Sequence, residues 1–377
     1  MSRTYKISLA APYINEKIES EVLSVIRSGW LVAGPKVDAF EQKLCEITGR
    51  KHAVAVSSGT GALLSAMVAM GIGPGSTVIV PAFTFPAPAS AAAFLGASIR
   101  LCDVDAHTMN ISVASLKAVL EERVSLVVGI DQFGNPCPAS DLAAVCEDAG
   151  VPLLVDAACS IGATLYERPC GAFGDASILS FHPRKIVTTA EGGAVLTDND
   201  EIATEVRRFR NIGLEDGVFK KVGFNLRPSE MGAAMGRVQL DLLDDLIARR
   251  RELAELYAAL PLGFQQPISD ARMNYQTLAA VLPMTKRDGT PFGVDIRSDF
   301  LTFLADRGIQ AQVASYHLAR IDWLVRQERV RPEDTPICSR LHDFGIALPM
   351  HCGLTDDDVK EVVDVCLDWL EQRSADV

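Results

Sequence analysis

Short apolar runs alternate with windows of helical periodicity through the first half of the chain. The helical windows lie at about 60–71, 86–95, 112–121 and 140–149. Near-continuous apolar runs separated by helices are typical of parallel strands that are covered by helices on both faces. We therefore predict an α/β protein built on a mostly parallel seven-stranded sheet. Its strands are expected at Ala53–Val56, Thr77–Val80, Ile99–Val104, Leu126–Ile130, Leu153–Val155, Ile178–Phe181 and Ala194–Leu196.

Helical periodicity also flanks this region on both sides. Before it, the pattern predicts a helix over residues 14–28 and a second helix from about Lys36 to Thr48. After it, a single long helix is predicted from about Ser229 to Ala259. The apolar stripe expected on the first of these helices consists of Ile14, Ile18, Val22, Leu23 and Ile26.

The chain beyond Asn274 predicts a smaller α+β unit. Its strands are expected at Tyr275–Leu282 and Gln310–Ser315, and its helices at Asp299–Arg307 and Asp356–Leu370. A chain of 377 residues is too long for one ordinary hydrophobic core. We therefore predict two domains: a large one over residues 1–245, with an N-terminal helical segment, and a small C-terminal α+β domain over residues 246–377.

Composition narrows the class of partner. Hydrophobic residues make up 48% of the chain and charged residues 22%, which is typical of a well-packed globular protein. The net charge is −12 and no basic run occurs, so we expect no nucleic-acid partner. The first residues lack the apolar core of a secretion signal, and no apolar segment reaches the length of a membrane span. Nine cysteines without metal-ligand spacing predict reduced thiols in a cytoplasmic protein that has no metal site.

The residues just after each strand are the first candidates for a binding site, because ligands of such sheets bind at the carboxyl ends of the strands. After the first strand, Ser57-Ser58-Gly59-Thr60-Gly61-Ala62 opens a helix. Free backbone N–H groups at a helix N-terminus suit a phosphate group, although the same residue types are also ordinary helix caps. The segment lacks the residues of a P-loop and of a Rossmann fingerprint.

Other strand ends carry further chemistry. Phe85 follows the second strand and could stack on a flat ligand or belong to the core. Asp156 follows the fifth strand, where a carboxylate is costly to bury without a partner. Ser180 and then Lys185 follow the sixth; the lysine is either solvated in a turn or held for a covalent role. A phosphate cradle, an aromatic face, a carboxylate, a hydroxyl and a lysine in one crevice together suit pyridoxal phosphate.

The chain resembles the fold-type I pyridoxal-phosphate enzymes and, more narrowly, the sugar aminotransferase family named for DegT, DnrJ and StrS. The resemblance runs nearly end to end and depends on the order and spacing of its motifs. These motifs are Ser28-Gly29-Trp30-Leu31, Gly34-Pro35-Lys36-Val37, Ser57-Ser58-Gly59-Thr60-Gly61-Ala62-Leu63, Gly71-Ile72-Gly73-Pro74-Gly75, Pro81-Ala82-Phe83-Thr84-Phe85, Val155-Asp156-Ala157-Ala158, Ser180-Phe181-His182-Pro183-Arg184-Lys185, Glu191-Gly192-Gly193-Ala194, Gly223-Phe224-Asn225-Leu226-Arg227 and Leu348-Pro349-Met350-His351-Cys352-Gly353-Leu354-Thr355.

The resemblance implies a fold-type I fold whose large domain binds the cofactor pyridoxal 5′-phosphate. By this resemblance, Lys185 would be the Schiff-base lysine and the proton carrier, and Asp156 would pair with the pyridinium nitrogen. Phe85 would stack on the ring.

The resemblance also implies the residues at the phosphate. These would be Thr60, Gly61 and Ser180, together with Asn225 from the neighbouring subunit, so that the active unit would be a homodimer with shared sites. The chain departs from the family pattern at Cys159, where Gln or His is common, and at Leu226, where an aromatic residue is usual.

The expected function is the transfer of an amino group from an amino acid, L-glutamate, to a keto-sugar. The expected acceptor is a nucleotide-linked 3- or 4-keto-6-deoxy sugar. Two alternatives stay open: an aminotransferase for a keto-cyclitol or another cyclic ketone, and a non-catalytic regulatory protein with the same fold. The lysine at position 185 disfavours the relatives that carry histidine there and act as sugar dehydratases.

Overall fold

The main sheet lies in the first half of the chain. A computed structural model describes residues 5–375 except 122, 286–288, 294 and 329. Within these residues, seven strands pair in the order β1–β10–β9–β6–β5–β2–β4. The five from β9 to β4 are parallel, whereas β10 is antiparallel to both of its neighbours, so the prediction of a mostly parallel sheet is confirmed. The strands are β1 (His52–Val56), β2 (Thr77–Pro81), β4 (Ser98–Cys102), β5 (Leu126–Ile130), β6 (Leu153–Asp156), β9 (Ala176–Ser180) and β10 (Gly193–Thr197).

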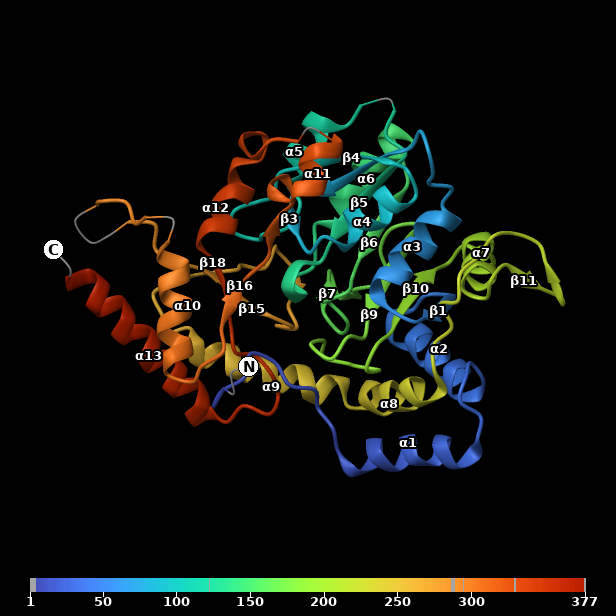
Figure 1. Cartoon of the computed structure of the whole chain (residues 1–377), viewed down its shortest axis with the longest axis horizontal. Helices are drawn as coiled ribbons and strands as arrows, with labels where there is room; N and C mark the ends of the chain where they lie inside the picture. Colours follow the sequence, from blue (N-terminus) through green and yellow to red (C-terminus); the bar gives the residue numbers. More distant parts are fainter. Residues whose placement is uncertain (1–4, 122, 286–288, 294, 329, 376–377) are drawn as a thin grey trace.

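Helices cover both faces of this sheet (Figure 1). Because successive residues of a strand point to opposite faces, Ala53 and Ala55 of β1 join one hydrophobic core and Val54 and Val56 join the other. The first core also contains side chains from α2, α5, α6 and α8, and the second contains side chains from α3, α4 and α7. These helices are α2 (Pro35–Thr48), α3 (Gly59–Ala69), α4 (Ala87–Phe94), α5 (Val113–Val119), α6 (Ala139–Ala149), α7 (Asp200–Arg210) and α8 (Glu230–Asp241).

The C-terminal part has its own antiparallel sheet in the order β13–β15–β18–β16 and its own core. This arrangement confirms the predicted α+β unit. Ile7 joins the same core and pairs with Ile309, so the N-terminal segment packs against the C-terminal part. The elements are α9 (Leu243–Tyr257), β13 (Gly263–Phe264), β15 (Leu278–Val281), α10 (Ile296–Asp306), β16 (Gln312–Val313), β18 (Gly345–Leu348) and α13 (Asp356–Ala375). The domain boundary at 245/246 lies within α9 and stays a prediction.

Short strand pairs join the C-terminal part to the segments around the main sheet. Two of them, β17 with β3 and β14 with β7, connect residues that are far apart in sequence. The remaining short elements are β3 (Phe83–Thr84), η1 (Gln132–Gly134), β7 (Thr164–Leu165), β8 (Arg168–Pro169), β11 (Leu214–Glu215), β12 (Val218–Phe219), β14 (Ala271–Arg272), β17 (Tyr316–His317), η2 (Leu318–Arg320), α11 (Asp322–Glu328), η3 (Pro332–Asp334) and α12 (Pro336–Phe344).

The predicted single helix from Ser229 to Ala259 is wrong in one respect, because the structure has two helices there, α8 and α9. They are separated at Leu242, whose φ of −101° and ψ of 5° are not helical. The Leu242 N–H donates to the carbonyl of Gln239, three residues earlier, so the regular helical ladder is interrupted at this point. Apolar periodicity did not reveal the break, because the side chains on both sides of it remain buried.

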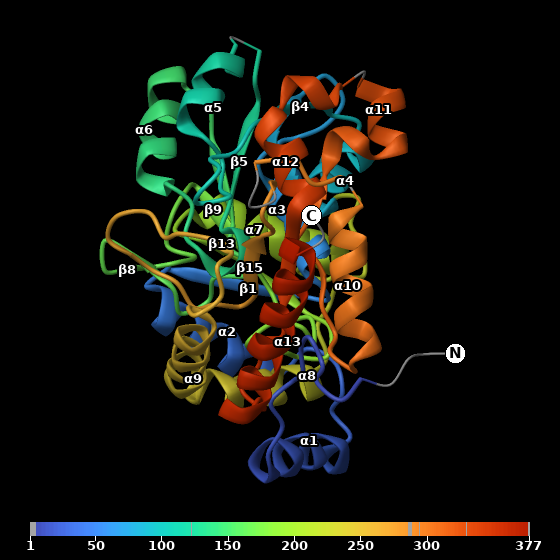
Figure 2. The same ribbon diagram turned by 90° about the vertical axis from the view of Figure 1, so that its left-hand side faces the viewer.

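The N-terminal helix α1 (Glu16–Ser28) corrects another detail. It lies below α8, away from the main sheet, in both views of the molecule (Figures 1 and 2). Ile18 of the expected stripe is buried, but Ile14, Leu23 and Ile26 are 45%, 42% and 52% exposed, and Val25 is buried in addition. The helix therefore buries only a narrow strip against α8 and leaves most of its apolar side chains in contact with solvent.

Candidate active site

Asp156 is the last residue of β6, and its neighbours explain its conformation. The Ala158 N–H donates to Asp156 Oδ1 at 3.0 Å, and the Ala157 N–H donates to the carbonyl of Ile178 on the adjacent strand β9. The side chain is 6% exposed. Burial raises the pKa of Asp156 to about 6, while the hydrogen bond from Ala158 and the positive charge of Lys185 act in the opposite direction. A buried carboxylate therefore lies close enough to Lys185 for the two charges to interact.

Lys185 lies in the turn between β9 and β10. The turn is closed by hydrogen bonds from the Lys185 N–H to the carbonyl of His182 and from the Thr189 N–H to the carbonyl of Phe181. The half-buried Lys185 side chain donates from Nζ to Cys159 Sγ at 3.0 Å. The lysine predicted to be reactive and the cysteine that departs from the family pattern are thus in direct contact.

The turn after β1 forms a close-packed helix N-terminus. Ser58 caps α3, because its Oγ accepts the Gly61 N–H at 3.0 Å, so this amide is satisfied by the protein itself. The Gly59 and Thr60 amides belong to the first helical turn, where no intrahelical acceptor exists. A Cβ atom on Gly59 would lie 2.8 Å from Ser180 Cβ, so only glycine allows α3 to approach the end of β9 this closely.

Phe85 and Asn225 are both exposed. Phe85 follows β3, is 63% exposed, and places its ring edge-on to Tyr316, with ring centroids 6.3 Å apart. Asn225 pairs through its backbone with Asn211, and the neighbouring Leu226 carbonyl accepts the Ser57 N–H at 2.8 Å. The structure therefore brings the backbone of the Asn225 segment to the turn after β1, with the Asn225 side chain open to solvent.

The residues at the strand ends fit pyridoxal phosphate. The first turn of α3 offers amides that have no intrahelical acceptor, and Ser180 lies against it. Asp156 has one oxygen bonded to Ala158, which leaves the other for a protonated ring nitrogen. Lys185 is half-buried and donates to Cys159 Sγ, so its amine is held within the site. Within the described residues, no group of three or more His, Cys, Asp or Glu side chains could hold a metal ion.

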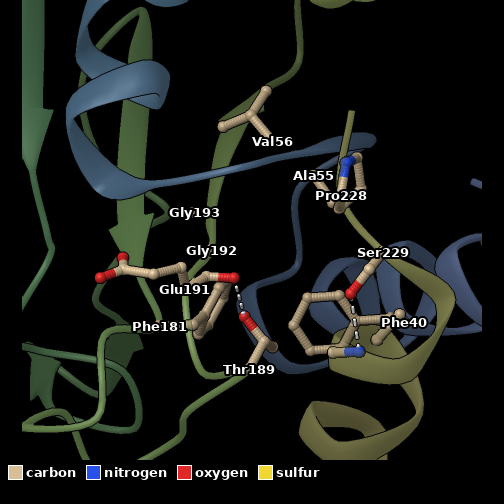
Figure 3. A pocket seen from close by; sticks show the side chains of 12 residues that line it. Phe40, Ala55, Val56, Phe181, Thr189, Glu191, Gly192, Gly193, Pro228 and Ser229 are labelled. Carbon is tan, nitrogen blue, oxygen red and sulfur yellow. Dashed lines mark hydrogen bonds between the residues drawn. The ribbon is translucent and has the colours of Figure 1, made fainter. Parts of the chain in front are cut away.

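Two hollows near these turns do not form the site. A cavity of about 10 Å³ lies behind the Gly192–Gly193 turn, where Phe40 packs edge-on to Phe181 and Thr189 donates to the Glu191 carbonyl (Figure 3). This volume suits one water molecule at most. A larger hollow of about 490 Å³ is lined by several arginines of α7 and by Arg227, but most of these have protein acceptors: Arg208 and Arg210 bind carboxylates and Arg227 binds Asn211.

Some residues around the site had not been predicted from the sequence. Asp131 follows β5 and lies close enough for its charge to raise the pKa of Asp156; its position after an apolar run is the same signal that identified Asp156. Asn274 and Gln276 bond to the turns that carry Cys159 and Lys185. Asn274 directly precedes the strand predicted at Tyr275–Leu282, and Gln276 falls within it, whereas the observed strand β15 begins at Leu278. A polar residue at the start of a predicted strand carries no such signal, because most residues of this kind are solvated.

The fold and the site together define the class. A mostly parallel sheet whose strand ends bring together a helix N-terminus, a buried aspartate and a lysine is the arrangement of a pyridoxal-phosphate enzyme. A family model of the DegT/DnrJ/EryC1/StrS aminotransferases matches residues 12–366. The chain belongs to this family. It is a fold-type I, pyridoxal-phosphate-dependent aminotransferase.

Three relatives illustrate the similarity. The spore coat polysaccharide biosynthesis protein SpsC of Bacillus subtilis (strain 168) is 31% identical, with 97% of each chain covered. GDP-perosamine synthase of Caulobacter vibrioides is 30% identical, with 96% of this chain and 98% of the relative covered. The structure of PseC of Helicobacter pylori, an aminotransferase involved in the biosynthesis of pseudoaminic acid, superposes with a TM-score of 0.90 at 25% identity over 97% of this chain and 99% of PseC. The relatives support a sugar aminotransferase.

No helix in the described part of this chain has the length and apolar character needed to cross a membrane.

Proposed function

We propose that Lys185 binds pyridoxal phosphate through Nζ and moves the proton during amino transfer, with Asp156 at the ring nitrogen. The contact between Lys185 and Cys159, next to the buried Asp156, carries this proposal. When bound, the cofactor would carry the amino group between the two substrates, and its protonated ring would stabilise the electron pair left when a proton leaves carbon. Asp156 would keep that ring nitrogen protonated, since a buried carboxylate strongly favours a cationic partner.

Five further residues complete the proposed cofactor site. Thr60, Gly61 and Ser180 are assigned to the phosphate, because they lie at or against the N-terminus of α3. The Gly61 amide would then share its hydrogen with the phosphate and Ser58 Oγ. Phe85 is assigned to the face of the ring, since its own ring is exposed. Asn225 is assigned to the phosphate of the neighbouring subunit, and its exposed side chain is consistent with this role.

The proposed substrates are L-glutamate as amino donor and a nucleotide-linked 3- or 4-keto-6-deoxy sugar as acceptor. Support for a nucleotide-linked acceptor comes from the GDP-perosamine synthases of Caulobacter vibrioides and Vibrio cholerae, each 30% identical to this chain. Their name indicates that their product is an amino sugar linked to GDP.

The decisive experiment is Lys185→Ala. The wild-type enzyme loaded with pyridoxal phosphate should absorb visible light and transfer ¹⁵N from labelled glutamate to one member of a panel of nucleotide-linked 3- and 4-keto-6-deoxy sugars and keto-cyclitols. The variant should lose the absorbance and essentially all transfer, because covalent attachment and proton movement both need the amine.

Lys117→Ala serves as the matched control, since Lys117 is an exposed lysine on α5 and should be dispensable. Undiminished transfer by Lys185→Ala would contradict the assignment of the lysine. Transfer to a keto-cyclitol alone would leave the lysine in place and overturn the sugar acceptor. A wild-type protein that stays colourless with added cofactor would favour a non-catalytic role.

We further propose a homodimer that shares its active sites. Apolar side chains are exposed together at the end of α1 and in the loop that follows: Ile26 at 52%, Trp30 at 61%, Leu31 at 44% and Val32 at 56%. The backbone of Val32 pairs with Ser229, which holds this loop beside the start of α8. An exposed apolar patch of this kind is typical of an interface between subunits.

A complementation assay tests the shared site. The Lys185→Ala and Asn225→Ala homodimers would each be impaired. A mixed dimer of the two variants would have one intact site, which takes Lys185 from the Asn225→Ala chain and Asn225 from the Lys185→Ala chain. After subunit exchange, activity should return to about a quarter of the wild-type value, because about half of the dimers are mixed and each has one complete site. If the two variants carry different affinity tags and co-purification shows that mixed dimers are present, no recovery of activity would place Asn225 in the site of its own chain.

We also propose that the protein works in the cytoplasm and has the two domains 1–245 and 246–377. All nine cysteines are free thiols, which supports a reducing compartment. The separate C-terminal core supports the division into domains.

A further inference from the structure

The segment Asn274–Gln276, between β14 and β15, contacts both turns that carry the proposed catalytic groups. Asn274 is completely buried, and its Nδ2 donates to the carbonyls of Cys159 and Ile161, both at 2.9 Å. Gln276 is 8% exposed, and its Nε2 donates to the carbonyl of Arg184 at 2.9 Å. One short segment therefore binds the turn after β6 and the turn after β9.

The two amide side chains are themselves held in place. Asn274 Oδ1 accepts the Gln276 N–H at 2.9 Å, and Gln276 Oε1 accepts the Thr277 hydroxyl at 3.0 Å. The Asn274 N–H donates to the Gly134 carbonyl at 3.2 Å. Such a network of buried hydrogen bonds fixes the orientation of both amides, because each alternative rotamer would leave a buried polar group unpaired.

A buried arginine holds the backbone of the same segment. Arg250, on α9, is 3% exposed, and its guanidinium donates to the carbonyls of Tyr275, Gln276 and Met350 at 3.1, 3.3 and 3.0 Å. Tyr275 has a φ of +51°, a conformation that is unfavourable for a bulky residue unless its surroundings enforce it. Burying a cation among carbonyls is costly, which indicates that this segment must keep one conformation.

The need for such a support follows from the topology. Strands β6 and β9 are paired up to Asp156 and Ile178, so the sheet fixes Asp156 directly. Cys159 and Lys185 lie beyond the ends of these strands, where the ladder no longer sets their separation. The hydrogen bonds from Asn274 to the Cys159 carbonyl and from Gln276 to the Arg184 carbonyl bridge this gap.

We propose that Asn274 and Gln276 are positioning residues that hold the Cys159 turn against the Lys185 turn. They thereby set where Lys185 Nζ lies relative to the Asp156 carboxylate. Arg250 keeps the backbone that carries both amides in place. This inference rests on the proposed role of Lys185. It adds to the site a third element, from beyond α9, that touches neither cofactor nor substrate.

The test compares Gln276→Met with Gln265→Met. Both glutamines are buried, and each donates from Nε2 to backbone carbonyls, but Gln265 binds Thr108 and Gln132 instead of the Lys185 turn. The two substitutions remove the same chemistry and should lower the thermal midpoint alike. Two measurements separate positioning from general stability: amide hydrogen exchange of residues 181–188 in the cofactor-free protein, and the pH midpoint of the visible absorbance in the loaded enzyme.

Gln276→Met should speed amide exchange in residues 181–188 by about 3- to 10-fold, because the turn loses its hydrogen bond from Gln276 Nε2 to the Arg184 carbonyl. It should also lower the pH midpoint by about 0.5 unit, because the positive charge on Lys185 Nζ moves away from the Asp156 carboxylate that stabilises it. Gln265→Met should change neither. Equal exchange and equal pH midpoints in the two variants would overturn the proposal.

If Gln276→Met does not fold, Thr277→Val carries the test. It removes only the hydroxyl that orients Gln276, so it should shift the pH midpoint in the same direction by a smaller amount, and an unshifted midpoint would overturn the proposal. Lys185→Ala separates this inference from the proposed function. If Lys185→Ala loses the absorbance but Gln276→Met titrates like the wild type, only the positioning role is wrong. If Lys185→Ala keeps the absorbance, the assignment of the lysine is wrong.

Discussion

Asp131 and Asp156 lie at the ends of neighbouring parallel strands, one residue apart in register, and their surroundings differ. Asp131 follows the last residue of β5, and Asp156 ends β6, where it pairs with Ile130. The Asp131 N–H even donates to the Asp156 carbonyl at 3.0 Å. In sequence, both are an aspartate that follows a buried apolar run.

The protein uses both oxygens of Asp131 internally. Its Oδ1 accepts the Cys137 N–H at 2.8 Å, and its Oδ2 accepts the Ser160 hydroxyl at 2.5 Å. Because Ser160 lies in the turn that follows Asp156, Asp131 supports the neighbouring turn. Burial raises the pKa of Asp131, and the two hydrogen bonds lower it in part.

Asp156 has one protein hydrogen bond, from Ala158 to Oδ1, and a lysine nearby instead of a second donor. The comparison shows that a carboxylate at a strand end is structural where loops saturate it and available for a ligand where they do not. The residue type is the same, but the two positions are one residue apart in the register of the sheet, because Ile130 and not Asp131 pairs with Asp156. The two side chains therefore start toward opposite faces and meet different loops, and only those around Asp131 bond both oxygens.

The largest expected effect is on catalysis at Asp156. Asp156→Asn keeps the acceptor for Ala158 but removes the negative charge, so turnover should fall by about 10²–10³-fold, as for the loss of one key electrostatic group. Steady-state transfer of labelled nitrogen measures this change. If Asp131→Asn, the matched variant just after β5, lost as much turnover while folded and loaded, the proposed contrast between the two aspartates would be wrong.

The next effect is on stability at Asp131. Asp131→Ala leaves the buried Cys137 N–H without its acceptor and frees the Ser160 hydroxyl, so the free energy of unfolding should fall by about 2–3 kcal/mol. Denaturant unfolding of the cofactor-free protein measures it. The folded fraction should still bind pyridoxal phosphate with an affinity within about 3-fold of wild type, since Asp131 would act only through the turn. A large loss of affinity with unchanged stability would assign Asp131 to the ligand.

The smallest expected effect is the pH dependence that Asp156 gives to the cofactor-free protein. Its pKa of about 6 lies above the value of 3.8 for a free aspartate, so the folded state binds the proton more tightly than the unfolded state. The contribution of Asp156 to the free energy of unfolding therefore falls as pH rises from about 4 to about 6 and is constant above that.

Asp156→Asn removes this dependence. Relative to wild type, the cofactor-free variant should gain about 2 kcal/mol of stability between pH 4 and pH 7, a value that follows from the size of the pKa shift. Urea unfolding at a series of pH values measures the gain. A variant that is more stable without cofactor and inactive with it would show that the wild-type carboxylate is kept for function, whereas a gain that does not depend on pH would contradict the raised pKa.

Much of the fold was predictable from the sequence, for a clear reason. The inner strands of the main sheet are short apolar runs, because strands covered on both faces must be apolar on both faces. The edge strand β4, which contains Ser98 and Arg100, is less uniform. The break at Leu242 and the exposed face of α1 were not predictable. An interrupted helix inside a core, and a helix with part of its apolar side chains exposed, both have the periodicity of an ordinary buried helix.

The family, the parallel sheet and the strand ends where Asp156 and Lys185 lie can all be read from the amino-acid sequence, because apolar periodicity and motif order are local properties of the chain. Three features became visible only in the folded chain. Cys159 contacts Lys185, both oxygens of Asp131 are bonded whereas one oxygen of Asp156 is not, and Asn274 and Gln276 bond to both turns. These contacts join residues that are distant in sequence, and polar residues in loops carry no periodic pattern that would indicate their partners.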